Sequence, residues 1–435
     1  MGRNVPPAAN VISAMSVSRA NPAVIGWALA LLTALLTCTG ALASRIKDFP
    51  QAVISSDEGL HGVRPSSVSD SSARAVDSAA VARWLVHATG TGALATTSVH
   101  LQGLPFASAI SFSDGVPDKP SSGHLWFYMS AMDVSCDDIL ANATASLTLS
   151  EASIPERASW CQTSPMDEED PNCVKLTITG NFQRVSSADT KTAEEALFAR
   201  HPDMKLWPRG HKWLILELKP TSLFLLDAYG GAKHIPVEEF MRAEPAPTPK
   251  KLPPPPPATG RPAFFERARR ARWLVHSSRW GTLGTTSVHL FGAPFGSAIS
   301  FSDGADDEAT GRIFMYLTKM DAAAQDIAAS SSSVASFTLT EMPLGVCKRV
   351  CAEDPTCARI TLTGPVRVVN GTDTQLARDA LFSRHPAMAR WPAEHHFEFY
   401  ELHIETIFFL DMYGGAKPLE LAEYWKAYGS APTMP

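Results

Sequence analysis

The stretch "SAISFSDG" occupies Ser108–Gly115 and returns without a change of letter at Ser297–Gly304. It mixes apolar, aromatic and small polar residues and ends in Asp-Gly, a pattern typical of a β-strand that runs into a turn. A strand that is repeated in this way predicts that one folding unit occurs twice in the chain.

Other segments on both sides of this stretch recur in the same order. They are "RWLVH" (Arg83–His87, Arg272–His276), "TTSVHL" (Thr96–Leu101, Thr285–Leu290), "LFARHPDMKLWP" against "LFSRHPAMARWP" (Leu197–Pro208, Leu381–Pro392) and "LDAYGGAK" against "LDMYGGAK" (Leu226–Lys233, Leu410–Lys417). We therefore predict two homologous domains, at residues 79–243 and 263–430.

The segment between the two units, residues 244–262, is rich in proline. Five consecutive prolines fit neither a helix nor a central strand, so we predict a semi-rigid polyproline linker. Residues 44–78, before the first unit, are rich in Ser, Ala and Val without periodicity. We predict a flexible spacer there.

The N-terminal residues 1–43 carry an apolar stretch that ends in Ala41-Leu42-Ala43. This is the pattern of a secretory signal peptide cleaved after Ala43. The stretch is longer than the usual signal core, which leaves an uncleaved membrane anchor as the alternative. Both readings place the chain in the secretory lumen, where the sequons at Asn142 and Asn370 are predicted to carry N-glycans.

Each unit is mostly strand by its residue pattern. Short runs rich in β-branched and aromatic residues are bounded by Gly, Pro, Asp or Ser. Helical spacing occurs at residues 80–88, before the first strand, and at residues 188–201. About seven strands at this spacing favour a barrel or sandwich with helices packed outside, an α+β fold that is mostly β.

The chain resembles the CREG family of secreted glycoproteins. The motifs that carry the resemblance are "FASAISFSDG", "WFYMSAMD", "PNCVKLTITG", "LFARHPDMKLWP" and "FLLDAYGG", and together they span nearly all of both units. The resemblance implies two FMN-binding-like split β-barrels, as in pyridoxamine-phosphate oxidases. Because such barrels usually form homodimers with ligand clefts at the interface, the tandem copy implies an intrachain pseudo-dimer.

The resemblance also raises the question of a flavin. Relatives that bind FMN place polar and basic residues at a helix where this chain has Ser135–Asp138 and Ala323–Asp326, which offer carboxylates and no cation. Because like charges repel a phosphate, no cofactor is expected, with FMN as the alternative. The small polar residues predicted to line the clefts are Thr97, Ser98, Ser111, Ser113, Thr286, Ser287, Ser300 and Ser302.

Histidines recur in pairs, and we interpret them as structural. The pairs are His87 with His276, His100 with His289, His201 with His385, and His211 with His395. His201 and His385 each follow a predicted helix and precede proline, where a histidine can cap the helix C-terminus. Neither H-E-x-x-H nor C-x-x-C occurs, and neither a nucleophile elbow nor a P-loop is present. We therefore predict no metal site and no catalytic residues.

Six cysteines follow the signal segment. Cys161 and Cys173 bracket one loop, and Cys347 and Cys357 bracket its counterpart, so we predict two disulfides that close these loops. Cys136 and Cys351 are left over. The residues alone leave open whether these two pair with each other, bind elsewhere or stay free.

The net charge of −6 argues against a nucleic-acid partner. We expect the acidic run Asp167–Asp170 and the basic run Glu266–Trp273 to be solvated surface.

The favoured function is that of a secreted or endolysosomal glycoprotein that binds rather than catalyses, with a cell-surface or sorting receptor as partner. A membrane contact is expected only if the N-terminal segment is uncleaved. The alternative is an oxidoreductase or carrier with FMN or a tetrapyrrole at the barrel–barrel cleft, and a structural surface protein is third.

Overall fold

The computed structural model describes residues 77–347, 350–413, 415 and 417–427. The predicted signal segment and almost all of the predicted spacer lie outside the described residues. Residues from Arg74 onward form one compact unit that contains both copies of the repeat.

The first copy is an antiparallel barrel with flanking helices. Its strands are β1 (Thr91–Thr97), β2 (Pro105–Ser111), β3 (Trp126–Ser130), β4 (Thr144–Ser150), β5 (Lys175–Arg184), β6 (Trp213–Leu226) and β7 (Lys233–Ile235), and its helices are α2 (Ser78–Ala88), α3 (Val134–Ala141), α4 (Pro155–Gln162), α5 (Thr190–Arg200) and α6 (Val237–Arg242). The strand order is β2-β1-β4-β5-β6-β3, with β7 on β6. A bridge between Ser113 and Trp126 joins the two ends of this order and closes the barrel.

The second copy repeats this plan. Its strands are β8 (Trp280–Thr286), β9 (Pro294–Ser302), β10 (Ile313–Leu317), β11 (Val334–Thr340), β12 (Arg359–Val368), β13 (Glu398–Leu402), β14 (Thr406–Leu410) and β15 (Lys417–Pro418), and its helices are α7 (Arg267–Ser277), α8 (Ala322–Ala329), α9 (Asp373–Arg384) and α10 (Leu421–Lys426). Because β12 pairs with β11 as well as with β13, the six strands from β8 to β13 form a closed ring.

Each barrel encloses its own apolar core. Equivalent positions of the repeat fill both cores, among them Leu94 and Leu283, and Phe112 and Phe301, all fully buried. The two helices predicted from spacing are present as α2 and α5. His201 is the C-cap residue of α5 and His385 that of α9, which are the predicted positions. Their Nε2 atoms each lie 2.9 Å from a carbonyl oxygen outside the helix, that of Phe112 and that of Phe301.

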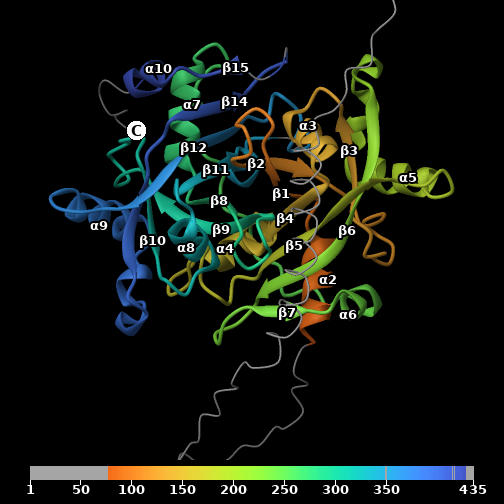
Figure 1. Cartoon of the computed structure of the whole chain (residues 1–435), viewed down its shortest axis with the longest axis horizontal. Coiled ribbons are helices and arrows are strands. Elements are labelled where there is room, and N and C mark those ends of the chain that lie inside the picture. The colour runs from red at the N-terminus through yellow and green to blue at the C-terminus, as the bar shows by residue number, and fades with distance from the viewer. Residues whose placement is uncertain (1–76, 348–349, 414, 416, 428–435) are drawn as a thin grey trace, which may run out of the picture. The chain divides into compact units, whose positions relative to one another are not determined.

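The barrels pack against each other through matching contacts. β2 lies against β11 and β12, and β4 lies against β9 (Figure 1). The Thr177 hydroxyl donates to Gly296 O at 2.7 Å, and the equivalent Thr361 hydroxyl donates to Ala107 O at 2.6 Å. Such paired contacts are those of an isologous dimer interface, here formed within one chain.

The connecting region has two features that the sequence did not predict. The proline-rich linker is docked on both barrels: Lys250 O accepts from Arg157, and the Ala258 amide donates to Leu344 O. The basic run is not a solvated helix face, because Arg270 and Arg272 on α7 are buried. Arg270 pairs with Glu341 at 2.8 Å, so its burial is compensated by an ion pair.

Candidate functional site

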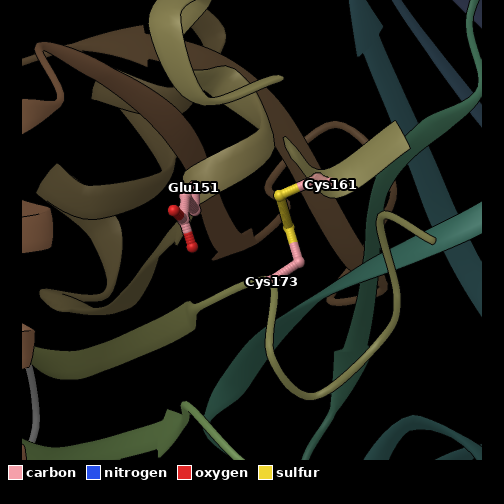
Figure 2. Close-up of side chains that lie close together, drawn as sticks. All are labelled: Glu151, Cys161 and Cys173. Atoms are coloured by element: carbon pink, nitrogen blue, oxygen red, sulfur yellow. A yellow bond between two sulfur atoms is a disulfide. The ribbon is translucent and has the colours of Figure 1, made fainter. Parts of the chain in front are cut away.

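Two disulfides set the position of the loops at the barrel interface. Cys161 pairs with Cys173 and Cys347 with Cys357, as predicted. Glu151 lies beside the first disulfide (Figure 2), where it accepts from the Arg157 side chain and the Val174 amide. Since both sulfurs are in the disulfide, this group offers no thiolate to a metal. The disulfide and the buried glutamate instead hold the base of the loop.

The first loop, Asp167–Asp170, enters a cleft in the second barrel that we call the second cleft. The Ser300 amide donates to Glu169 Oε2 at 3.0 Å, and the Ser300 hydroxyl donates to Asp167 Oδ1. Asp167 Oδ2 lies 2.7 Å from His385 Nδ1. The predicted solvated tip is therefore wrong, because this loop is covered by the other barrel.

Charges from both barrels balance the first loop. Glu168 Oε1 accepts from Arg279 Nε at 2.7 Å, and Lys175 Nζ donates to the carbonyls of Glu169 and Asp170 at 2.8 Å. Burial lowers the pKa of Lys175 to about 8. Burial works against ionisation of Asp167 too, but His385 and Ser300 outweigh it and hold the pKa of that carboxyl at about 2.

The second loop, Cys351–Asp354, enters the matching first cleft in the first barrel. The Ser111 amide donates to Glu353 Oε2 at 2.9 Å, and the Cys351 amide donates to Asp203 Oδ2 at 2.9 Å. Arg359 donates to Ala352 O at 3.2 Å. Burial raises the pKa of Glu353 to about 8. The two loops thus place an equivalent glutamate on an equivalent serine amide.

The free cysteines do not pair with each other. Cys136 lies buried on α3, and Cys351 is the first residue of the second loop. Burial raises the pKa of the Cys351 thiol well above its usual range, and Glu353 and Asp203 add to the effect. Both thiols are therefore held in the protonated, unreactive form.

The structure separates the eight residues predicted to line the clefts. Ser111 and Ser300 lie at the clefts and bind the loops of the opposite barrel. The Ser113 and Ser302 hydroxyls are buried and donate to the carbonyls of Gly115 and Gly304. The other four, Thr97, Ser98, Thr286 and Ser287, lie at the opposite ends of the β1–β2 and β8–β9 hairpins.

The helices predicted to face a flavin phosphate use one carboxylate each for structure. Asp138 on α3 accepts from the Thr96 hydroxyl at 2.7 Å and from the Val99 amide. Asp326 on α8 accepts from Thr285 and Val288 in the same way. These buried carboxylates tie each helix to the turn of its first hairpin.

A cavity of about 210 Å³ lies between the barrels. Its lining includes Thr91, Gly92 and Leu149 of the first barrel, Arg279, Trp280 and Leu339 of the second, and Pro255 and Pro256 of the linker. This volume is below the roughly 300–1,000 Å³ of common small-molecule and cofactor sites.

Sequence reasoning placed Ser111 and Ser300 at the clefts but missed that the two disulfide-closed loops enter them. The repeat did contain a signal, because Glu169-Asp170-Pro171 recurs as Glu353-Asp354-Pro355 within otherwise dissimilar loops. The partner serines, however, belong to the other copy. No local spacing connects a loop to them.

Asn142 and Asn370, the two predicted glycosylation sites, are both exposed. Within the part of the chain that the structure describes, no helix is long and apolar enough to cross a membrane.

Comparison with known proteins gives the family. A family model described as "CREG, beta-barrel" matches residues 73–242 and again 262–426. Mouse protein CREG2 is 41% identical over 169 residues, which cover 38% of this chain and 57% of CREG2. Chicken protein CREG1 is 36% identical over 172 residues, which cover 39% of this chain and 88% of CREG1. The match to CREG2 thus spans little more than half of that protein's length.

Solved structures are similar to the chain at lower sequence identity. A heme-binding protein from Mycobacterium smegmatis is 15% identical, with 75% of this chain and all of that chain covered and a TM-score of 0.32. Because the family model covers both units and each unit closes into the expected barrel, the chain belongs to the CREG β-barrel family and carries two copies of its domain.

Proposed function

We propose that this chain is a glycoprotein of the secretory pathway, in the extracellular or endolysosomal lumen, that acts by binding and not by catalysis. Its partner would be a cell-surface or sorting receptor. In this proposal the barrels are a rigid scaffold, and their clefts serve to hold the two copies together.

The observation that carries the proposal is the reciprocal occupation of the clefts. Glu169 accepts from the Ser300 amide and Glu353 from the Ser111 amide, so each barrel inserts a carboxylate into the other. A cofactor in the same place would have to displace a disulfide-closed loop. In the second cleft a flavin phosphate would in addition meet the ionised Asp167, which repels it.

Two further observations support the cellular location. Two disulfides are typical of proteins that fold in an oxidising compartment. The exposed positions of Asn142 and Asn370 suit attachment of glycans.

Colour tests the absence of a cofactor. The full chain, purified from a eukaryotic host, is expected to show neither flavin nor heme absorbance and not to quench FMN fluorescence on titration. A matched variant with Glu169→Ala and Glu353→Ala removes both inserted carboxylates. Stoichiometric flavin in the wild-type protein would overturn the proposal, whereas flavin binding by the variant alone would support it.

Glycan mapping tests the compartment. Endoglycosidase is expected to shift the secreted wild-type chain and to have no effect on a variant with Asn142→Gln and Asn370→Gln. A wild-type chain that leaves the cell without sugar at either site would contradict the glycoprotein assignment.

A second candidate is a carrier of a planar cofactor between the barrels. The cavity that Trp280 and the linker prolines help to line favours it. Its small volume favours the first proposal. Visible absorbance of the purified protein distinguishes the two, since a bound flavin or tetrapyrrole is coloured.

A further inference from the structure

Three potential metal ligands meet where the first loop enters the second barrel. The side chains of Asp167, Glu168 and His385 place one ligand atom each within 4.8 Å of one another. All three residues are buried. Two come from the first copy and one from the second, so the cluster exists only because the copies are packed together.

The hydrogen bonds of His385 determine which ring nitrogen is available. Nε2 lies 2.9 Å from the Phe301 carbonyl oxygen, which can only accept, so Nε2 carries a hydrogen. In the neutral ring Nδ1 then presents a lone pair toward Asp167 Oδ2, 2.7 Å away, and Glu168 Oε2, 3.7 Å away. Metal-ligating histidines usually have one ring nitrogen fixed by a backbone carbonyl in this way, and here the other nitrogen faces the two carboxylates.

The carboxylates are oriented in the same way. The outer oxygens are bound, Asp167 Oδ1 by the Ser300 hydroxyl and Glu168 Oε1 by Arg279. The inner oxygens face His385. Among the described residues, Glu168 Oε2 is buried and has no hydrogen-bond partner. A buried acceptor without a donor is unfavourable, and this one points at the other two ligands.

A proton and a metal ion differ in how many of these three side chains they can bind. One proton on His385 Nδ1 bonds Asp167 and leaves Glu168 Oε2 without a hydrogen bond. A divalent ion can be reached by all three atoms. Arg279 adds a positive charge nearby, because its Nη2 lies 3.5 Å from His385 Nδ1. This charge is paired with Glu168, since Arg279 Nε donates to Glu168 Oε1.

We propose that Asp167, Glu168 and His385 bind one divalent transition-metal ion, Zn²⁺ in the first instance, which fastens the first loop to the second barrel. One imidazole and two carboxylates are ordinary zinc ligands. Hard cations such as Mg²⁺ favour oxygen ligands only, which makes them weaker candidates.

The first cleft provides an internal control. When the loops are aligned on their shared Glu-Asp-Pro, Cys351 stands in place of Asp167 and Ala352 in place of Glu168. His201 keeps the same bond to a carbonyl, that of Phe112. Within the described part of the chain, it forms no ion pair with a carboxylate, so the same metal site is not expected there.

The experiment uses the full chain, stripped with a chelator and titrated with ZnCl₂ by calorimetry, with Co²⁺ absorption as a second readout. Wild type and His201→Gln are expected to bind one tight equivalent. Glu168→Gln keeps the size of the side chain, and we expect it to weaken binding at least as much as the roughly 10–100-fold loss that follows removal of a second-shell partner. Zinc should raise the Tm of the first two proteins and not that of Glu168→Gln.

Three results would overturn the site. They are no tight zinc equivalent in the wild type, equal zinc affinity in Glu168→Gln, and loss of zinc in His201→Gln. Circular dichroism of the metal-free variants shows whether each is folded. If Glu168→Gln fails to fold, Glu168→Ala, the residue found in the first cleft, takes its place in the comparison.

Discussion

The first and second clefts share the same backbone contact but differ in the side chains around it. In both, a disulfide-closed loop from the opposite barrel places a glutamate on a serine amide, Glu353 on Ser111 and Glu169 on Ser300. In the second cleft the preceding loop residues are the charged Asp167 and Glu168; in the first they are Cys351 and Ala352. Duplication has therefore preserved the backbone contact that joins the copies, while the neighbouring side chains differ.

This difference shows how a covalent dimer departs from a symmetric one. In a homodimer both clefts change together, because one gene encodes both. Here the second cleft adds Asp167, Glu168 and His385 to the shared glutamate. The first cleft has its glutamate, Glu353, beside a neutral thiol and Asp203. Matched substitutions in the two clefts show whether the clefts differ in stability as they do in composition.

The largest expected loss of stability follows substitution of the basic side chains that donate hydrogen bonds to the loops. Lys175→Met leaves the carbonyls of the first loop without donors and removes a buried positive charge, so we expect a loss of about 3–5 kcal/mol in the free energy of unfolding. Arg359→Met, at the equivalent position, breaks longer bonds of 3.2 and 3.3 Å and should cost about 1–3 kcal/mol. Urea unfolding measures both, and equal losses would show that the clefts are energetically alike.

The disulfides come next, and here we expect the two copies to behave alike. Their loops are of similar length, with sequence separations of 12 and 10. Changing Cys161 and Cys173 to serine, or Cys347 and Cys357, should lower stability by about 2–4 kcal/mol in each case. Thermal unfolding of the two double variants gives the comparison. A much larger loss for one pair would mean that its loop does more to hold the barrels together.

The first cleft should make stability depend on pH. The pKa of Glu353 in the folded chain is raised to about 8 by burial, against about 4.5 for an ordinary glutamate. Folding then favours the protonated form, so the contribution is fully present below about pH 4.5 and is lost as the pH rises through about 8. Glu353→Gln removes this dependence.

Between pH 5 and pH 9, we expect the free energy of unfolding of the wild type to fall by about 1–2 kcal/mol relative to that of Glu353→Gln. The expected loss is modest because the Glu353 side chain is only partly buried. Tm measured across this range tests the expectation. A difference that is constant with pH would exclude Glu353 as the titrating group.

The smallest effect is expected at the repeated "LDAYGGAK" segment. Tyr229 donates to Asp170 at 2.8 Å and Tyr413 to Asp354 at 3.1 Å, each at the end of a loop. Both rings are mostly exposed, so Tyr→Phe at either position should cost about 0.5–1 kcal/mol. Matched unfolding curves of the two single variants provide the measurement. A loss above about 2 kcal/mol at one position would reveal a further asymmetry.

Much of the fold could be predicted because its determinants are local. Strand runs such as "SAISFS", the helix spacing of α5 and the C-cap histidines depend on residues close together in the chain. The disulfides followed from short loops with a cysteine at each end. The family resemblance then gave the barrel, and the repeat gave the pairing of the two barrels.

The site could not be predicted in the same way. Asp167–Asp170 was expected to be solvated because four consecutive acidic residues rarely lie in a core. Their partners, Ser300 and His385, come from the other copy, and no spacing rule connects residues so far apart. The basic run on α7 was misjudged for the same reason, because the partner of Arg270 is the distant Glu341.

The residues alone specify two copies of one domain, a proline-rich linker and a cysteine-bracketed loop in each copy, because repeats and short loops can be read locally. The resemblance to the CREG family adds that each copy is a barrel. Packing of the two barrels places each loop in the opposite barrel, and it gathers Asp167, Glu168 and His385 in one cleft and not in the other. Burial and charge pairing across the interface depend on which surfaces meet, and that is a property of the folded chain alone.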